Sequence, residues 1–315
     1  MNMPSKRGFV LLAVLWVMVG VSAVGFGLAL LARRAAGTTH NRRAAAVATW
    51  LAEDCANRVE AAIGDALTHR AQDSARTTEV TLRSWSRLDQ AVASSPFMGG
   101  APCGVTMRPT GTTIDVNTAD DSLLIRLFLA LGNAPDQADS LAAAILDWRD
   151  GDDVARPGGA EASWYLARGL VPPRNADLAD IRELVRIRGF DQRTGLDSVL
   201  GVEPDRIVLD RAPLAVIAAL PGFTNEAVAR VADHRNRGVP ITDLLSLSAE
   251  LSPAARAAML ADYPDLVRLT TAEPDAWLLT ARGTAGTPPV TVVLEFRLVR
   301  AGDRAAIVRR RTWVQ

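Results

Sequence analysis

The hydrophobic pattern opens with one unbroken uncharged run, from Gly8 to Ala32, directly after Lys6 and Arg7. At about 1.5 Å per helical residue, a run of this length crosses a hydrocarbon core of roughly 30 Å. A cleaved secretory signal would have a shorter apolar core that ends in a helix break. The run therefore predicts a membrane-spanning helix over residues 9–32, and an ordinary uncleaved anchor is the simplest alternative.

The helical pattern continues beyond the span. No proline occurs between Pro4 and Pro96, and an alanine-rich segment follows the apolar run. One helix is expected from about Phe9 to about His69. Apolar residues spaced by three and four form one stripe along its second half: Val47, Leu51, Cys55, Val59, Ala62, Ile63 and Ala66. We expect this stripe to pack against a sheet.

Short β-like stretches stand on both sides of a long helical block. In chain order they are 79–85, 104–107, 113–116, 276–281, 290–299 and 305–314. The helical block runs from about residue 119 to about residue 269. Strands, a long helical interruption and strands again indicate an α+β fold, in which a helical domain is inserted between the strands of an antiparallel sheet.

The composition of the chain argues against several classes of binding site. The formal net charge is +0 and aromatic residues make up 5% of the chain, so no overall electrostatic attraction favours nucleic acid or an anionic membrane surface. The two cysteines, Cys55 and Cys103, do not have C-x-x-C spacing, which excludes cysteine-based metal and redox motifs. In an oxidising compartment they have one possible bridge, Cys55–Cys103, and the alternative is two buried thiols.

Four carboxylates lie close together in the string D-W-R-D-G-D-D: Asp147, Asp150, Asp152 and Asp153. Their repulsion would be relieved by a hard cation such as calcium, which takes six to eight oxygen ligands, and Glu161 could complete the shell. The spacing departs from the loop of an EF-hand, so only the chemistry matches. The alternative is a solvated acidic loop, aided by Arg149 and Arg156.

The string L-P-G-F-T-N-E-A, residues 220–227, is similar to the hairpin of a helix-hairpin-helix DNA-binding motif, and residues 187–190 form a weaker version. In that motif two glycines let backbone N–H groups approach a phosphate. Here Thr224 replaces the second glycine, and Glu226 would repel the phosphate. We therefore expect a structural hairpin without nucleic acid, with DNA binding as the alternative.

The histidines do not suggest an active site. His40, His69 and His234 are scattered, and none accompanies a serine or cysteine in a recognisable nucleophile elbow. The sequence also contains no glycine-rich phosphate loop. We therefore do not expect an enzyme.

The string Lys6-Arg7-Gly8-Phe9 resembles the processing site of type IV pilins and type II secretion pseudopilins. In those families a membrane peptidase cuts after the glycine, here Gly8, and the new amino-terminal phenylalanine, here Phe9, is methylated. Most such subunits carry a glutamate at the position that falls on Ala13, where it is thought to pair with the amine of a neighbouring subunit. Its absence is typical of the minor pseudopilin called protein K.

The middle of the chain resembles the same family. Four segments are similar to its successive landmarks, in order: 114–119, 144–150, 175–189 and 211–222. The resemblance implies a pilin-like long N-terminal helix packed on an antiparallel sheet, with a large all-α domain inserted between the sheet strands. It also supports calcium as the one cofactor to expect.

The resemblance divides the chain into five parts: a leader (1–8), a transmembrane helix (9–32), an extramembrane helix with the first pilin-like strands (33–117), an inserted helical domain with hairpin elements (118–270), and C-terminal strands (271–315). Basic residues on both sides of the span leave its orientation open by charge alone. The short leading segment and the resemblance both favour an inner-membrane protein of bacteria with its globular part in the periplasm.

The function implied is that of a minor pseudopilin of the type II secretion system. It would stand at the tip of the pseudopilus and nucleate or cap its assembly, so that folded proteins are exported across the outer membrane. Its partners would be the prepilin peptidase, the major pseudopilin and the other minor pseudopilins of the tip. The alternatives are a membrane-tethered DNA-binding protein of a competence system and a minor pilin of a type IV pilus.

Overall fold

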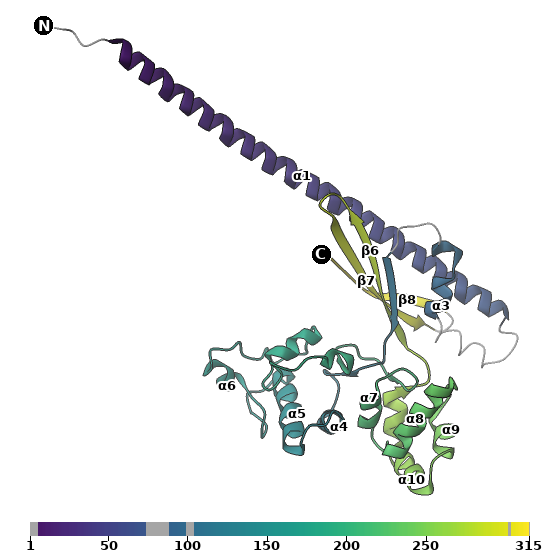
Figure 1. The fold of residues 1–315 in the computed structure, drawn as a ribbon. Coiled ribbons are helices and arrows are strands. Elements are labelled where there is room, and N and C mark those ends of the chain that lie inside the picture. The colour runs from purple at the N-terminus through teal and green to yellow at the C-terminus, as the bar shows by residue number, and fades with distance from the viewer. Residues whose placement is uncertain (1–5, 74–87, 99–103, 302–303, 315) are drawn as a thin grey trace.

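The computed structural model describes residues 6–73, 88–98, 104–301 and 304–314 (Figure 1). Its first element is the single long helix α1 (Lys6–Asp73), which contains the whole helix expected from the sequence. Two short elements follow, α3 (Leu88–Ala93) and η1 (Pro96–Met98). The strand expected at 79–85 lies outside the described residues.

The main sheet has four antiparallel strands in the order β1-β6-β7-β8. They are β1 (Gly104–Pro109), β6 (Ala276–Ala285), β7 (Val290–Ala301) and β8 (Arg304–Val314). Each overlaps a strand-like stretch expected from the sequence, and the alternation of apolar and less apolar residues was the signal for β7. Strand β1 is separated by the whole insertion from β6, its partner in the sheet, so an antiparallel sheet with a helix along one face is confirmed.

Helix α1 lies directly on this sheet, but its buried stripe differs from the expected one. The buried residues of this stretch are Ala44, Ala48, Ala52, Cys55, Ala56, Val59, Ala62 and Ile63. The start of the expected stripe was wrong, since Val47 is 45% exposed and Leu51 only half-buried. The side chain of Ala66 is outside the described part.

The reason for this shift is a close approach of backbones. A Cβ atom at Gly286, in the hairpin after β6, would stand 2.5 Å from the Cβ atom of Ala44, so this hairpin touches the helix directly. Only a small residue fits between such surfaces. Alanine therefore occupies the contact face at Ala44, Ala48 and Ala52, and the larger Val47 turns outward.

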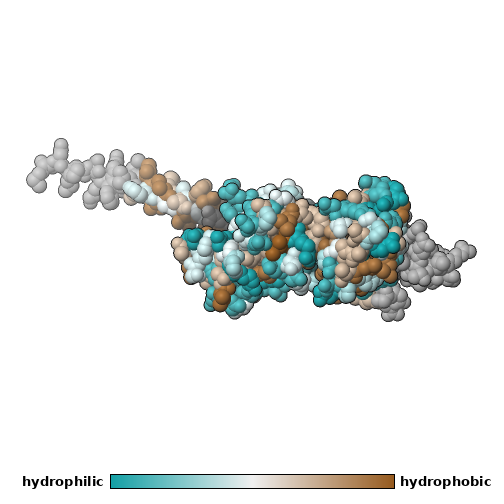
Figure 2. Space-filling view, turned by 90° about the horizontal axis from the view of Figure 1, so that it is seen from below, coloured by the Kyte–Doolittle hydropathy of each residue, from teal (hydrophilic) through white to brown (hydrophobic). Residues whose placement is uncertain are grey.

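The first half of α1 projects away from the rest of the molecule. Among the described residues, α1 is the one helix that is long and apolar enough to cross a membrane, and its apolar window is not buried. Trp16 and Phe26, for example, are each 68% exposed. Apolar residues lie along this projecting part, beside a head whose visible face is largely hydrophilic (Figure 2). Such an exposed apolar surface suits lipid as its surroundings.

The segment between β1 and β6 forms a mainly helical domain with its own hydrophobic core. Its helices are α4 (Asp121–Ala130), α5 (Pro135–Arg149), α6 (Ala162–Leu166), η2 (Ile181–Arg186), η3 (Leu196–Ser198), α7 (Leu214–Ala219), α8 (Asn225–Arg237), α9 (Leu244–Ala249), α10 (Pro253–Ala261) and α11 (Tyr263–Leu269). An all-α insertion is not confirmed, because two short parallel strand pairs tie it together. The pairs are β2 (Ile114–Asp115) with β3 (Leu200–Gly201), and β4 (Ile207–Val208) with β5 (Thr270–Thr271).

The insertion sits at the end of the sheet that is farther from the membrane span. The β6–β7 hairpin lies beside Ala44, near the span, whereas the chain enters and leaves the insertion at Pro109 and Ala276, at the other end of the strands (Figure 1). Strand β6 separates these ends by roughly 30 Å, at about 3.3 Å per residue. The inserted domain is therefore the membrane-distal part of the head.

Ion pairs hold the insertion against the sheet. Arg297 of β7 pairs with Asp205, and its Nε lies 3.4 Å from a carboxylate oxygen of Glu203. Arg206, in the insertion, pairs at 2.7 Å with Asp275, the residue before β6 where the chain returns to the sheet. The side chain of Asp205 is only 3% exposed, so loss of its partner would leave a buried charge uncompensated. These ion pairs therefore stabilise the contact between the inserted domain and the sheet.

Candidate metal centre

The acidic loop after α5 is built around one buried carboxylate. Asp147, in the last turn of α5, has no exposed side-chain surface and accepts hydrogen bonds from the backbone N–H of Arg156 at 3.1 Å and from its Nη1 at 2.8 Å. A Cβ atom at Gly159 would stand 2.0 Å from Oδ2 of Asp147, so glycine is needed there. These contacts fold the loop back onto the end of the helix.

The folded loop brings three other carboxylates together. Asp150, Asp152 and Glu161 each offer an oxygen atom, and these atoms lie within 4.8 Å of one another. Glu161 is the residue before α6 and is only 3% exposed, yet neither of its carboxylate oxygens has a hydrogen-bond partner in the described part of the chain. A buried carboxylate without a partner is costly, so this arrangement favours a bound cation.

The electrostatics point the same way. Burial, followed by the negative charges of Asp147 and Asp150, raises the pKa of Glu161 to about 7. Hydrogen bonds to Asp150 and Asp147 raise the pKa of Arg156, which therefore stays charged and compensates those two carboxylates. Glu161 and Asp152 are left without a described cation. A calcium ion would supply the missing positive charge, with backbone oxygens and water completing six to eight ligands.

The structure treats the four aspartates expected at this site differently. Asp150 and Asp152 lie together with Glu161, as a cation shell requires. Asp147 is fully buried and lies outside this group, although Arg156 pairs with it as well as with Asp150, and Oδ1 of Asp153 accepts a hydrogen bond from Asn175 at 3.4 Å. A bound calcium ion remains a prediction, and the geometry favours Asp150, Asp152 and Glu161 as its ligands.

The two arginines near the acidic loop, Arg149 and Arg156, have different partners. Arg149 does not compensate the acidic loop as expected, because its Nη2 donates to the carbonyl oxygen of Ala119 at 2.6 Å and its Nη1 to that of Val116. Burial lowers the pKa of Arg149. Of these two arginines, Arg156 is therefore the one that pairs with carboxylates of the acidic loop. The sequence signal for this arrangement is the pair Gly158-Gly159, which permits the tight return of the loop.

The hairpin after α7 is an internal joint. Gly222 has φ +67°, and a Cβ atom there would stand 2.7 Å from the carbonyl oxygen of Ala258 in α10. Glu226 accepts hydrogen bonds from the backbone N–H and the hydroxyl of Ser252, at 2.7 and 2.6 Å. Thr224 caps α8 by accepting from the N–H of Ala227. The hairpin backbone thus faces another helix, as a structural role requires.

Two other groups of predicted residues are placed as follows. Gly8 and Phe9 lie in the first turns of α1, and the description does not extend to their side chains. Cys55 is 2% exposed on the sheet-facing side of α1, whereas Cys103 lies outside the described residues. Processing after Gly8 and the Cys55–Cys103 bridge both remain predictions.

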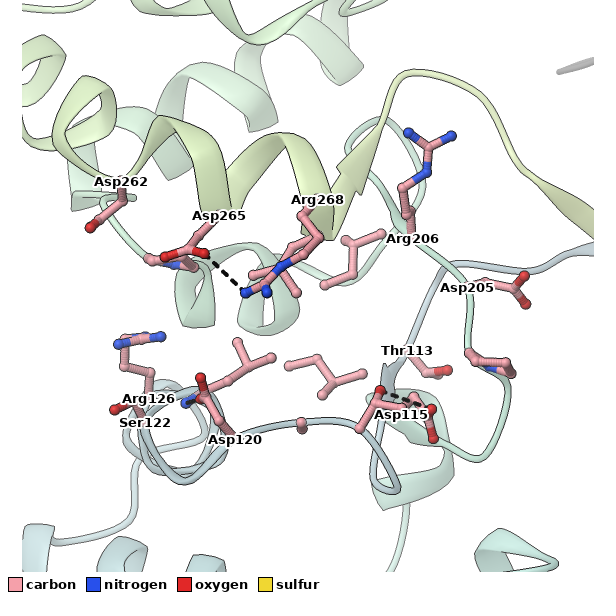
Figure 3. Close-up of a pocket in the computed structure, with 18 residues that line it drawn as sticks. Thr113, Asp115, Asp120, Ser122, Arg126, Asp205, Arg206, Asp262, Asp265 and Arg268 are labelled. Atoms are coloured by element: carbon pink, nitrogen blue, oxygen red, sulfur yellow. Dashed lines mark hydrogen bonds and ion pairs between the residues drawn. The ribbon is translucent and has the colours of Figure 1, made fainter. Parts of the chain in front are cut away.

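A cleft of about 710 Å³ lies between α4 and α11 (Figure 3). Arg126, from α4, and Arg268, from α11, line opposite walls, and the pair Arg268–Asp265 spans 2.9 Å along α11. Nε of Arg126 donates to the carbonyl oxygen of Ala219 at the end of α7. Because arginines and aspartates both line the cleft, its charge does not select one class of ligand.

The geometry defines an α+β protein, with one long N-terminal helix, apolar enough in its first half to cross a membrane, laid on an antiparallel sheet and a mainly helical domain at the far end of that sheet. Residues 109–196 match the family described as type II secretion system (T2SS), protein K. The segment runs from the last residue of β1 to η3 and contains the candidate metal centre. The match of this segment to the protein K family of the type II secretion system confirms the resemblance seen in the sequence.

Among solved structures, the chain is similar to one in the crystal structure of the GspK-GspI-GspJ complex from the type 2 secretion system of enterotoxigenic Escherichia coli. The sequence identity is 18% and the TM-score 0.47, and the match covers 67% of this chain and 79% of that chain. The comparison with curated proteins gives no match.

Proposed function

We propose that this protein is a minor pseudopilin that stands at the tip of the pseudopilus and nucleates or caps its assembly. The family match over residues 109–196 supports a role in type II secretion. The observation that carries the tip position is the place of the insertion, at the end of the sheet farthest from the membrane span. A domain in that place occupies the space where a further subunit would be added.

The anchor helix supports the same position. The span carries Ala13 where most pilin-like subunits have a glutamate that pairs with the amine of a neighbour. An ionised carboxylate in an apolar helix bundle is stable only when it is paired. A subunit at the apex has no neighbour above it to pair with, so an apolar residue at this position suits the tip.

The proposal also assigns a location and a set of partners. The protein would be held in the bacterial inner membrane by the single span of α1, with sheet and insertion in the periplasm. The prepilin peptidase would cut between Gly8 and Phe9. The mature subunit would then assemble with other minor pseudopilins and stand on the major pseudopilin. Calcium, if bound by Asp150, Asp152 and Glu161, would hold the loop after α5 in shape, and the protein would act by assembly without catalysis.

The proposal is tested by purifying the full-length protein from detergent-solubilised inner membranes of cells that express the whole secretion system. We expect it to bring down other minor pseudopilins in a defined, equimolar complex. Recovery of the protein free of other pseudopilins, or as one of many copies in a uniform oligomer, would contradict the proposal. The matched control is the same purification from cells that lack the other minor pseudopilins.

A further inference from the structure

One tryptophan outside the membrane span is left almost bare. Trp50 is 80% exposed, although it stands in the part of α1 that packs on the sheet. Ala48 and Ala52, two residues before and two residues after it, are buried against the sheet. Because each helical residue turns the chain by about 100°, Trp50 lies about 200° around the helix from each of them. The indole therefore projects from the side of α1 opposite the sheet, where a large apolar side chain calls for an explanation.

Lipid is not the explanation. The expected span ends at Ala32, and at about 1.5 Å per residue Trp50 lies roughly 27 Å farther along the same helix. Tryptophans that anchor a helix in the membrane lie at the level of the lipid headgroups, immediately beside the hydrocarbon core. Trp50 stands well beyond that level, on a helix that runs from Lys6 to Asp73 without interruption.

The surroundings of Trp50 have the composition of a protein interface. Val47, one turn before it, is 45% exposed and extends the apolar surface. Arg43 lies two turns toward the membrane and Asp54 one turn away from it, where Asp54 pairs with Arg58 at 2.7 Å. An apolar centre formed by a tryptophan and ringed by charged residues is typical of an interaction hot spot.

We infer that Trp50 and Val47 dock on the extramembrane part of a second, parallel helix that belongs to another membrane-anchored pseudopilin. Helices that pack side by side in a bilayer leave it side by side when they continue without a break. Since the sheet covers the side of α1 that carries Ala48 and Ala52, the side that carries Trp50 is the one open to a neighbouring helix at this level. This inference rests on the proposed function and adds the surface through which the partner is held.

The test uses the full-length protein in the co-purification described above, with two variants. Trp50→Ala should weaken the complex with the other minor pseudopilins at least tenfold in apparent Kd, because hot-spot tryptophans contribute at least about 1.4 kcal/mol. Its Tm alone should equal that of the wild type, because the side chain is exposed. The control, Val308→Ala, removes a side chain that is 55% exposed on β8 and should leave the complex intact.

The outcomes separate the two proposals. If the wild type forms the complex and Trp50→Ala forms it equally well, the docking surface is wrong and the proposed function stands. If the wild type itself recovers no minor pseudopilin, both are wrong. A photo-crosslinking residue at position 50 should attach to the helix of another pseudopilin, and attachment to lipid or to a second copy of this chain would overturn the inference.

Discussion

A Cβ atom at Gly283 would stand 2.0 Å from the carbonyl oxygen of Ala48, so strand β6 and helix α1 meet backbone to backbone. The same hypothetical atom would lie 2.6 Å from the backbone nitrogen of Ala52. The anchor helix and the sheet therefore behave as one packed unit at this point. A subunit that is inserted through its helix thereby fixes the height of its head above the membrane.

Replacement of Gly283 by alanine should separate the helix from the sheet. The added methyl group has no space between two backbones, and overpacking of this kind typically destabilises by about 1–3 kcal/mol. We expect a clear fall in the Tm of the protein in detergent. Gly104→Ala on the neighbouring strand is the control, since its nearest contact would be an ordinary 3.4 Å to Cβ of Arg282. Equal Tm values for the two variants would show that α1 and β6 are less closely packed than the structure has them.

Calcium should stabilise the protein through Glu161. At a concentration one hundred times the Kd, a ligand adds about 2.7 kcal/mol to stability, which raises Tm by several degrees. Glu161→Gln should abolish this gain, since it removes the charge of a ligand that is only 3% exposed. Asp153→Asn should keep the gain, because Asp153 lies outside the cluster of three. A wild-type melting curve that is identical with calcium and with a chelator would remove the site.

The stability of the cation-free protein should fall as pH rises toward neutrality. The pKa of Glu161 is raised to about 7 by burial and by nearby carboxylates, and burial raises the pKa of Glu273 to about 7. Each folded carboxyl then binds its proton more tightly than the unfolded one, so its contribution is complete below about pH 4.5 and is lost through about pH 7. Each shift corresponds to about 3 kcal/mol at most.

Melting curves between pH 5 and pH 8 test whether stability falls as the pH rises. Glu161→Gln and Glu273→Gln should each flatten part of the pH dependence. Since calcium replaces the proton at Glu161, the gain in Tm from calcium should be larger at pH 8 than at pH 6. A calcium effect that grows toward acid pH would contradict the assignment of Glu161 as a ligand.

Processing of the leader should depend on Gly8. Gly8→Ala adds a side chain at the position after which the peptidase is expected to cut, and we expect the variant to keep residues 1–8. Mass spectrometry of the amino terminus distinguishes the two forms, because we expect the processed protein to begin with a methylated Phe9. Gly20→Ala, deeper in the span, is the control and should be processed normally. A variant at Gly8 with the same mature terminus as the wild type would refute the predicted cleavage site.

The sequence predicted the long helix, the strands after residue 270 and the presence of an insertion, because these depend on local periodicity and on the absence of proline. It correctly placed Cys55, Val59 and Ile63 on the buried side of α1, but it did not predict where that buried stripe begins. Val47 and Ala48 are both apolar, and the choice between them depends on two glycines of β6 and the hairpin after it, more than two hundred residues away.

The candidate metal centre shows the same limit. The acidic string placed Asp150 and Asp152 among the four candidate ligands, since their spacing is local. It could not separate Asp147, which is fully buried and lies outside the group of three carboxylates, from the other aspartates. The burial of Glu161 depends on the return of the loop over Gly158 and Gly159, and this is a tertiary contact that spacing does not reveal.

We propose that this protein occurs once, at the apex of the pseudopilus. Gold labelling of the protein on purified pseudopili, viewed by electron microscopy, tests it most directly, with labelled major pseudopilin as the control for access along the fibre. We predict one cluster of label at a single end of each fibre. Label distributed along the fibres would contradict the account.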